Sequence, residues 1–153
     1  MLSFMSGLFS RLMSLLPSRQ IPSSGSVSPS LPAVSLPESS GKTNSTPLAW
    51  GAKVSPEFRA KVVDICRWLQ IHPDWLMACM AFETGYTFSP AARNKAGSSG
   101  TGLIQFMAAT ARGLGTTTTA LAAMSAIEQL DWVRMYFKPY AGRMHGLADV
   151  YMA

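Results

Sequence analysis

The residue best suited to chemistry is Glu83, a single carboxylate near the end of an apolar segment. It ends the run Met-Ala-Phe-Glu at 80–83 and is followed by Thr84 and Gly85. Apolar surroundings disfavour the ionised carboxylate, so the pKa rises toward the value that a general acid needs near neutral pH. The alternative for a lone Glu near a helix end is a solvated surface charge.

A second stretch, Gly-Thr-Gly-Leu-Ile-Gln-Phe-Met at 100–107, contains Gln105 as its only side-chain amide. The intervening residues 86–102 are rich in Gly, Ser, Asn and Pro, which predicts an ordered loop that folds back from the helix end. The loop can therefore bring Gln105 to Glu83. Apolar walls with one acid and one amide suit a sugar-binding cleft.

The distribution of carboxylates favours a mechanism with one acid. Ordinary glycosidases use two acids about 5–9.5 Å apart, and no Asp or Glu occurs between Glu83 and Glu128. Five of the six other acids of the domain, all except Asp149, have structural explanations in first helical turns, in a capping box or on exposed helix faces: Glu57, Asp64, Asp74, Glu128 and Asp131.

These stretches resemble a known family. Residues 83–85, Glu-Thr-Gly, and 102–111, Gly-Leu-Ile-Gln-Phe-Met-Ala-Ala-Thr-Ala, are similar to the Glu-Ser-Gly and Gly-Leu-Met-Gln-x-Met-Pro-x-Thr-Ala motifs of soluble lytic transglycosylases. These enzymes form glycoside hydrolase family 23 and share a fold with goose-type lysozyme. The resemblance covers about residues 56–153 and is strongest to phage members. Thr84 replaces the usual serine, and Ala108 the usual proline.

The resemblance implies cleavage of the β-1,4 bond between N-acetylmuramic acid and N-acetylglucosamine in peptidoglycan, with a 1,6-anhydro product. Glu83 would protonate the glycosidic oxygen and then act as base on the muramic 6-hydroxyl. It implies substrate contacts by Gln105 and Met107, by Asn94 where relatives carry serine, and by Tyr151, which matches the tyrosine of the family's third motif. No metal or cofactor is expected.

The elements that position these residues are helical, so the expected fold is mainly α, lysozyme-like, with at most a small β element. Apolar residues at steps of three and four, with Ser and Pro at helix starts, predict the helices. In the last long helix Ile127, Leu130, Val133, Met135 and Phe137 are expected in the core. The predicted helices cover residues 56–70, 73–85, 108–113 and 126–137. A polar turn is predicted over 116–119, and a short strand or the start of a helix over 103–107. A final helix is predicted after Gly146, and the chain end cuts it short, as in a truncated product.

The N-terminal part has a different composition. Residues 1–16 predict an amphipathic helix, too short to span a bilayer and a poor signal peptide. Residues 17–49 are rich in Ser and Pro and predict a flexible linker, so the folded domain is expected over 50–153. Contact of residues 1–16 with a membrane or a virion protein is expected, with location in a phage virion or at the periplasmic face of the host envelope.

The net charge of +5 suits an anionic partner such as a cell-wall polymer or a membrane, and the absence of a dense Lys/Arg run disfavours nucleic acid. Peptidoglycan glycan strands are the partner that the resemblance implies. Three alternatives stay open: a lysozyme-type hydrolase of the same bond, a non-catalytic cell-wall-binding or virion structural module, and a docking protein acting through residues 1–16. Cys66 and Cys79 predict two reduced, buried thiols, with a single disulfide as the alternative.

Overall fold

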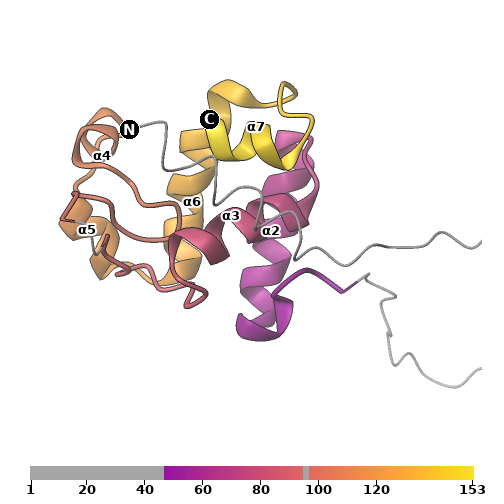
Figure 1. Cartoon of the computed structure of the whole chain (residues 1–153), viewed down its shortest axis with the longest axis horizontal. Coiled ribbons are helices and arrows are strands. Elements are labelled where there is room, and N and C mark those ends of the chain that lie inside the picture. The colour runs from indigo at the N-terminus through magenta and orange to yellow at the C-terminus, as the bar shows by residue number, and fades with distance from the viewer. Residues whose placement is uncertain (1–46, 95–96) are drawn as a thin grey trace, which may run out of the picture. The chain divides into compact units, whose positions relative to one another are not determined.

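The computed structural model describes residues 47–94 and 97–153, which form a mainly helical domain (Figure 1). The predicted helix over residues 1–16 and residues 17–46 of the predicted linker lie outside the described residues. None of the described helices is long and apolar enough to cross a membrane. The elements in chain order are η1 (Gly51–Lys53), α2 (Pro56–Leu69), α3 (Pro73–Glu83), α4 (Ala108–Gly113), α5 (Thr118–Ala123), α6 (Ala126–Phe137), η2 (Lys138–Tyr140) and α7 (Leu147–Met152).

Helices α2 and α6 begin at serine caps, as predicted. The Ser55 hydroxyl oxygen accepts the backbone N–H of Phe58 at 3.2 Å. Ser125 and Glu128 form a reciprocal capping box, in which each side chain accepts the other residue's backbone N–H. These bonds satisfy N–H groups that a helix leaves unpaired at its start. The predicted starts of both helices are confirmed because the signal is local.

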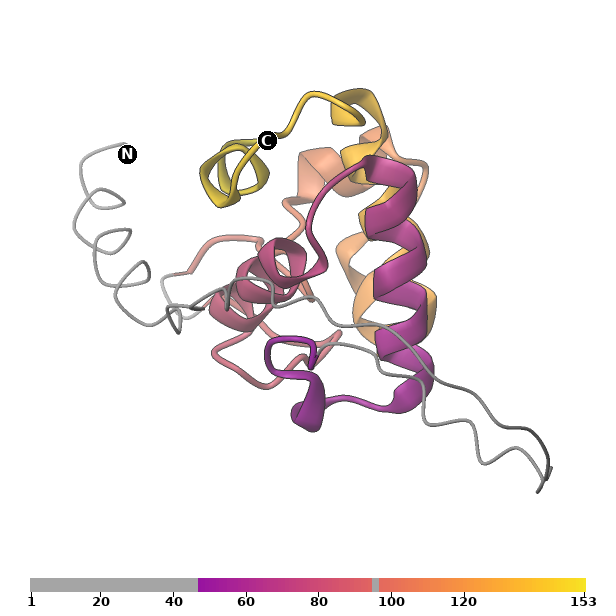
Figure 2. The same ribbon diagram turned by 90° about the vertical axis from the view of Figure 1, so that its right-hand side faces the viewer.

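Helix α3 is the central element of the domain. Its residues Leu76 to Ala81 are all buried, which is typical of a helix covered on every side. α3 packs against α2 and α7, and α2 packs along α6 (Figures 1 and 2). The start of α3 is capped by His72, whose Nδ1 accepts the backbone N–H of Asp74 at 3.3 Å. The last residue of α3, Glu83, lies at the edge of the core and is partly exposed.

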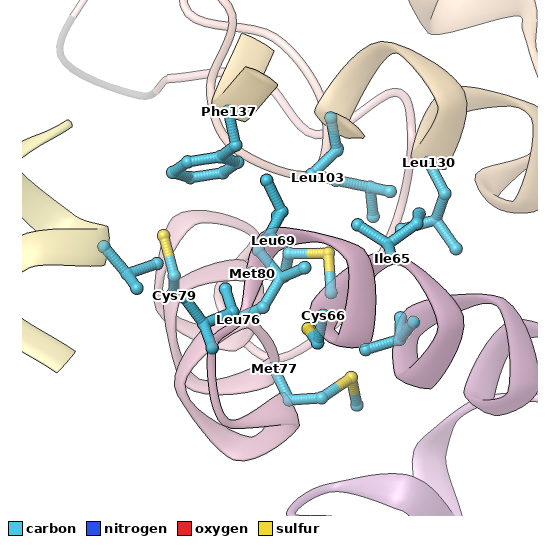
Figure 3. Packing of buried hydrophobic residues seen from close by; sticks show 14 of the residues in the cluster. Ile65, Cys66, Leu69, Leu76, Met77, Cys79, Met80, Leu103, Leu130 and Phe137 are labelled. Carbon is cyan, nitrogen blue, oxygen red and sulfur yellow. The ribbon is translucent and has the colours of Figure 1, made fainter. Parts of the chain in front are cut away.

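The core joins the helices to the loop between α3 and α4. Figure 3 shows Leu103 of this loop packed close to side chains of α2 and to Leu130 of α6. Cys66 and Cys79 are buried in the same cluster as free thiols, so the disulfide alternative does not apply. Burial raises the pKa of both thiols to about 12. Each is therefore an unreactive core residue at neutral pH.

Three local predictions need correction. The polar turn predicted over 116–119 leads into α5, because the Thr117 hydroxyl oxygen accepts the N–H of Ala120 and starts a helix there. Of the stretch predicted as a strand or a helix start, residues 103–105 form a turn, Phe106 forms an isolated β-bridge with Thr101, and Met107 is the N-cap of α4. Met135, predicted in the core, is 45% exposed, because it lies on the outer face of α6, two residues beyond the buried Val133.

Candidate active site

Glu83 is the last residue of α3 and is only partly exposed. Burial is the main cause that raises the pKa of its carboxyl group. The end of a helix carries partial negative charge, which also disfavours a carboxylate there. No Asp or Glu of the described residues is among the groups that shift this pKa. Glu83 is thus a lone acid whose surroundings favour the protonated form.

The turn after Glu83 is tightly held and strained. The Thr84 hydroxyl donates to the Met80 carbonyl at 2.7 Å and accepts the Phe88 N–H at 3.0 Å. Gly85, Tyr86 and Phe88 follow with φ of 59°, 66° and 52°. Positive φ is unfavourable for bulky residues and persists where the surrounding structure enforces it, often at functional sites. The turn therefore fixes the direction in which the chain leaves Glu83.

Tyr151 of α7 is brought to Glu83. Its ring packs edge-on against Phe82, with 5.5 Å between ring centroids. Its buried hydroxyl makes no hydrogen bond of standard geometry, but it interacts closely enough with Glu83 to lower the pKa of that carboxyl group. Burial and the negative charge of Glu83 in turn raise the pKa of Tyr151. Tyr151 therefore favours the ionised form of Glu83, while burial favours the protonated form.

Cys79, one helical turn before Glu83, marks the point where three helices converge. Glu83 adds to the raised pKa of Cys79, and Cys79 lies near enough to Tyr136 of α6 and Tyr151 of α7 to raise their pKa values. Figure 3 shows Cys79 on the side of α3 that faces α7. The candidate site is thus built where α7 packs against α3, with Tyr136 of α6 close enough for its pKa to be affected by Cys79.

The loop before α4 is organised by a small set of β-bridges. Thr101 pairs in antiparallel fashion with Arg93 on one side and Phe106 on the other. The Arg93 guanidinium donates to the fully buried Thr101 hydroxyl at 2.8 Å. These two isolated bridges are consistent with the expectation of at most a small β element, and they join Arg93, Thr101 and Phe106 of the loop.

Gln105, Asn94 and Met107 all lie on this loop. Gln105 has φ of 53°, its Nε2 donates to the carbonyls of Gly102 and Ala92 at 3.1 and 3.3 Å, and its Oε1 is buried without a hydrogen-bond partner. The exposed Asn94 donates its backbone N–H to Gly100 at 3.2 Å. Met107 is 45% exposed.

The loop reaches α6 through aromatic packing, because the Phe106 ring lies edge-on to Tyr136 with centroids 6.2 Å apart. The predicted site residues therefore fall into two groups. Tyr151 interacts with Glu83, whereas Gln105 and Met107 lie beside Phe106 on the loop that packs against α6.

Gln129 of α6 is a site-building residue that the sequence motifs did not reveal. It is fully buried and hydrogen-bonded to the loop. A signal for it exists in the sequence, because it stands four residues before Val133 and eight before Phe137, on the buried face of α6. An amide on an apolar helix face needs internal partners.

A hollow of about 260 Å³ opens beside the starts of α2 and α6, with Lys53, Phe58 and Phe88 in its lining. The two serine hydroxyls in its lining are the helix caps of α2 and α6 and already accept backbone N–H groups. The hollow therefore offers mainly apolar packing surface.

Within residues 47–94 and 97–153, no three His, Cys, Asp or Glu side chains gather closely enough to hold a metal ion. No protein-family model, curated protein or solved structure matches the chain. The chemistry of the site therefore has to be judged from its own residues.

Proposed function

We propose that residues 50–153 form a peptidoglycan lytic transglycosylase domain with a lysozyme-like fold and Glu83 as its single general acid and base. The observation that carries the proposal is the environment of Glu83. Burial at the end of α3 raises its pKa, and no second carboxylate of the described residues is among the groups that shift it. A raised pKa moves a carboxyl group toward the protonated form that a general acid requires.

The reaction uses one carboxyl group twice. Protonated Glu83 gives its proton to the glycosidic oxygen as the bond from muramic C1 to that oxygen breaks. The resulting carboxylate takes the proton of the muramic 6-hydroxyl, whose oxygen closes on C1 to form the 1,6-anhydro ring. Glu83 is again protonated, and no water is consumed. Tyr151 supports the ionised intermediate state, because its presence lowers the pKa of Glu83.

The loop would supply substrate contacts. Met107 is exposed and Asn94 is at the surface, which suits both for contact with a glycan strand. Gln105 would contribute to the cleft mainly through its backbone turn, because its Nε2 already donates to the carbonyls of Gly102 and Ala92. We place the enzyme in a phage particle or at the host envelope, with residues 1–16 contacting a membrane or a virion protein.

The decisive experiment is to digest purified peptidoglycan and weigh the muropeptides. The proposal predicts 1,6-anhydromuramyl products. Products heavier by one water would instead identify a lysozyme-type hydrolase acting on the same bond.

A non-catalytic wall-binding module is the second candidate. It is favoured by the engagement of the Gln105 amide within the loop, which leaves it fewer groups for substrate. In this case the protein would sediment with purified walls, but their turbidity would not fall. Loss of turbidity with the wild type, and its absence with Glu83→Gln, would exclude this candidate.

A further inference from the structure

The amide of Gln129 ties α6 to two other parts of the chain. Its Oε1 accepts the backbone N–H of Leu103 at 2.7 Å, and its Nε2 donates to the carbonyls of Pro90 at 3.0 Å and Leu121 at 2.8 Å. The side chain is fully buried. Because both amide atoms are satisfied, this one residue fixes two distant points of the loop, 90 and 103, and the end of α5.

The loop is shaped to receive this side chain. Gly102 has φ of +79°, and a Cβ added there would lie 2.3 Å from Oε1 and 2.6 Å from Nε2 of Gln129. The Gln129 amide thus occupies the space that the side chain of any residue other than glycine at position 102 would need. Gly102 also donates its N–H to the Ala92 carbonyl at 2.8 Å, which closes the loop beside the amide.

α6 holds the same loop at a second point. Tyr136, two helical turns after Gln129, packs against Phe106 and lies near Cys79 of α3. Gln129 and Tyr136 together therefore connect residues 90–94 and 97–106 to α6. The two β-bridges of this loop pair it with itself, so they do not attach it to a helix.

We propose that Gln129 is a positioning residue, which holds the loop at Pro90 and Leu103 so that Gln105 and Met107 stand at a set place relative to Glu83. It acts through the loop and does not touch substrate, because it is fully buried. The activity part of this inference rests on the proposed function. The loop-holding part rests on the hydrogen bonds alone.

The test compares Gln129→Met, which keeps the length of the side chain and removes its hydrogen bonds, with Val133→Ala, which weakens the core one turn further along α6. Amide hydrogen exchange and the kinetics of peptidoglycan cleavage are measured at a temperature where both variants are folded. In Gln129→Met, exchange at Leu103 and its loop neighbours should accelerate at least about tenfold, while the α3 amides stay protected. KM should rise about tenfold, with the pH dependence unchanged.

Gln129→Glu is the second variant, because it retains the acceptor for Leu103 and loses both donors. It should keep the Leu103 amide slower to exchange than Gln129→Met does, and it serves as the test if the Met variant does not fold. Acceleration spread over the whole domain, or a KM equal to that of Val133→Ala, would overturn the proposal. If the wild type does not cleave peptidoglycan, the proposed function fails, and hydrogen exchange alone decides whether Gln129 holds the loop.

Discussion

Glu57 and Glu128 stand in the first turns of α2 and α6, whereas Glu83 stands at the last residue of α3. Backbone and serine hydrogen bonds lower the pKa of the first two, both fully exposed, while burial raises that of Glu83. A helix favours negative charge at its start and disfavours it at its end. The fold therefore uses two glutamates for stability and holds the third in a place that opposes its ionisation.

The backbone shows the same contrast. The starts of α2 and α6 are regular serine caps, whereas the turn after Glu83 contains Tyr86 and Phe88 at positive φ. Near the site, Gln105 Oε1 is buried without a hydrogen-bond partner among the described residues. Such strain and unsatisfied polar groups cost stability and are typical of functional regions.

The largest expected effect follows from removing the acid. Glu83→Gln should lower kcat for anhydromuropeptide release by at least about 10³-fold, because one group is lost from both proton transfers. The matched control is Glu57→Gln, an equally conservative change in an exposed helical turn, which should stay within about twofold of wild type. Equal activity of the two variants would remove Glu83 from the mechanism.

A smaller effect is expected from Tyr151→Phe. The Tyr151 hydroxyl lowers the pKa of Glu83, so its removal should raise that pKa further. The general acid would then remain protonated to higher pH, and the alkaline limb of the kcat/KM profile should shift to higher pH. Measuring the profile from about pH 4 to 9 checks this, and a limb that stays in place or moves downward would contradict the pairing of the two groups.

The smallest effect concerns stability, where the two kinds of glutamate should behave oppositely. The folded-state pKa of Glu83 is raised, so its contribution is present in acid and is lost as pH rises through that pKa. Glu83→Gln should therefore raise Tm by a few degrees at pH 7, with no gain at about pH 3. The pKa of Glu57 is lowered, so its contribution is present above its unfolded pKa and is lost in acid.

Glu57→Gln should accordingly lower Tm slightly at pH 7 and leave it unchanged in acid. Thermal unfolding followed by circular dichroism at both pH values checks the pair of variants. The comparison between the glutamates would be wrong if both substitutions changed Tm in the same direction at pH 7.

Helix positions were predictable where the determining interactions are local. Ser55 and Pro56 mark the start of α2, and the Ser125–Glu128 pair marks the start of α6, since caps act within one turn. α5 was not predicted as a helix because its threonines have low helix propensity, although its Thr117 cap lies in the polar turn predicted over 116–119 and Leu121 is buried in the core. Glu83 was chosen as a candidate from its apolar neighbours in the sequence, and it stays a prediction.

The other half of the site depends on contacts between distant residues. The turn at 102–105 is held by the hydrogen bond between Leu103 and Gln129, which lie 26 residues apart. The approach of Phe106 to Tyr136 likewise has no counterpart in local spacing. The spacing of apolar residues identifies the buried face of a single helix or strand. It cannot show which loop will hydrogen-bond to the Gln129 amide of α6.

The buried thiols described in the core offer a way to observe opening of the molecule. With pKa values of about 12, Cys66 and Cys79 should resist alkylation as long as the fold is closed, because only an accessible thiolate reacts. Cys79 lies where α3 meets α6 and α7, whereas Cys66 lies on α2. The alkylation rate of Cys79 would therefore report local opening around Glu83, and that of Cys66 would report exposure of the α2 side of the core.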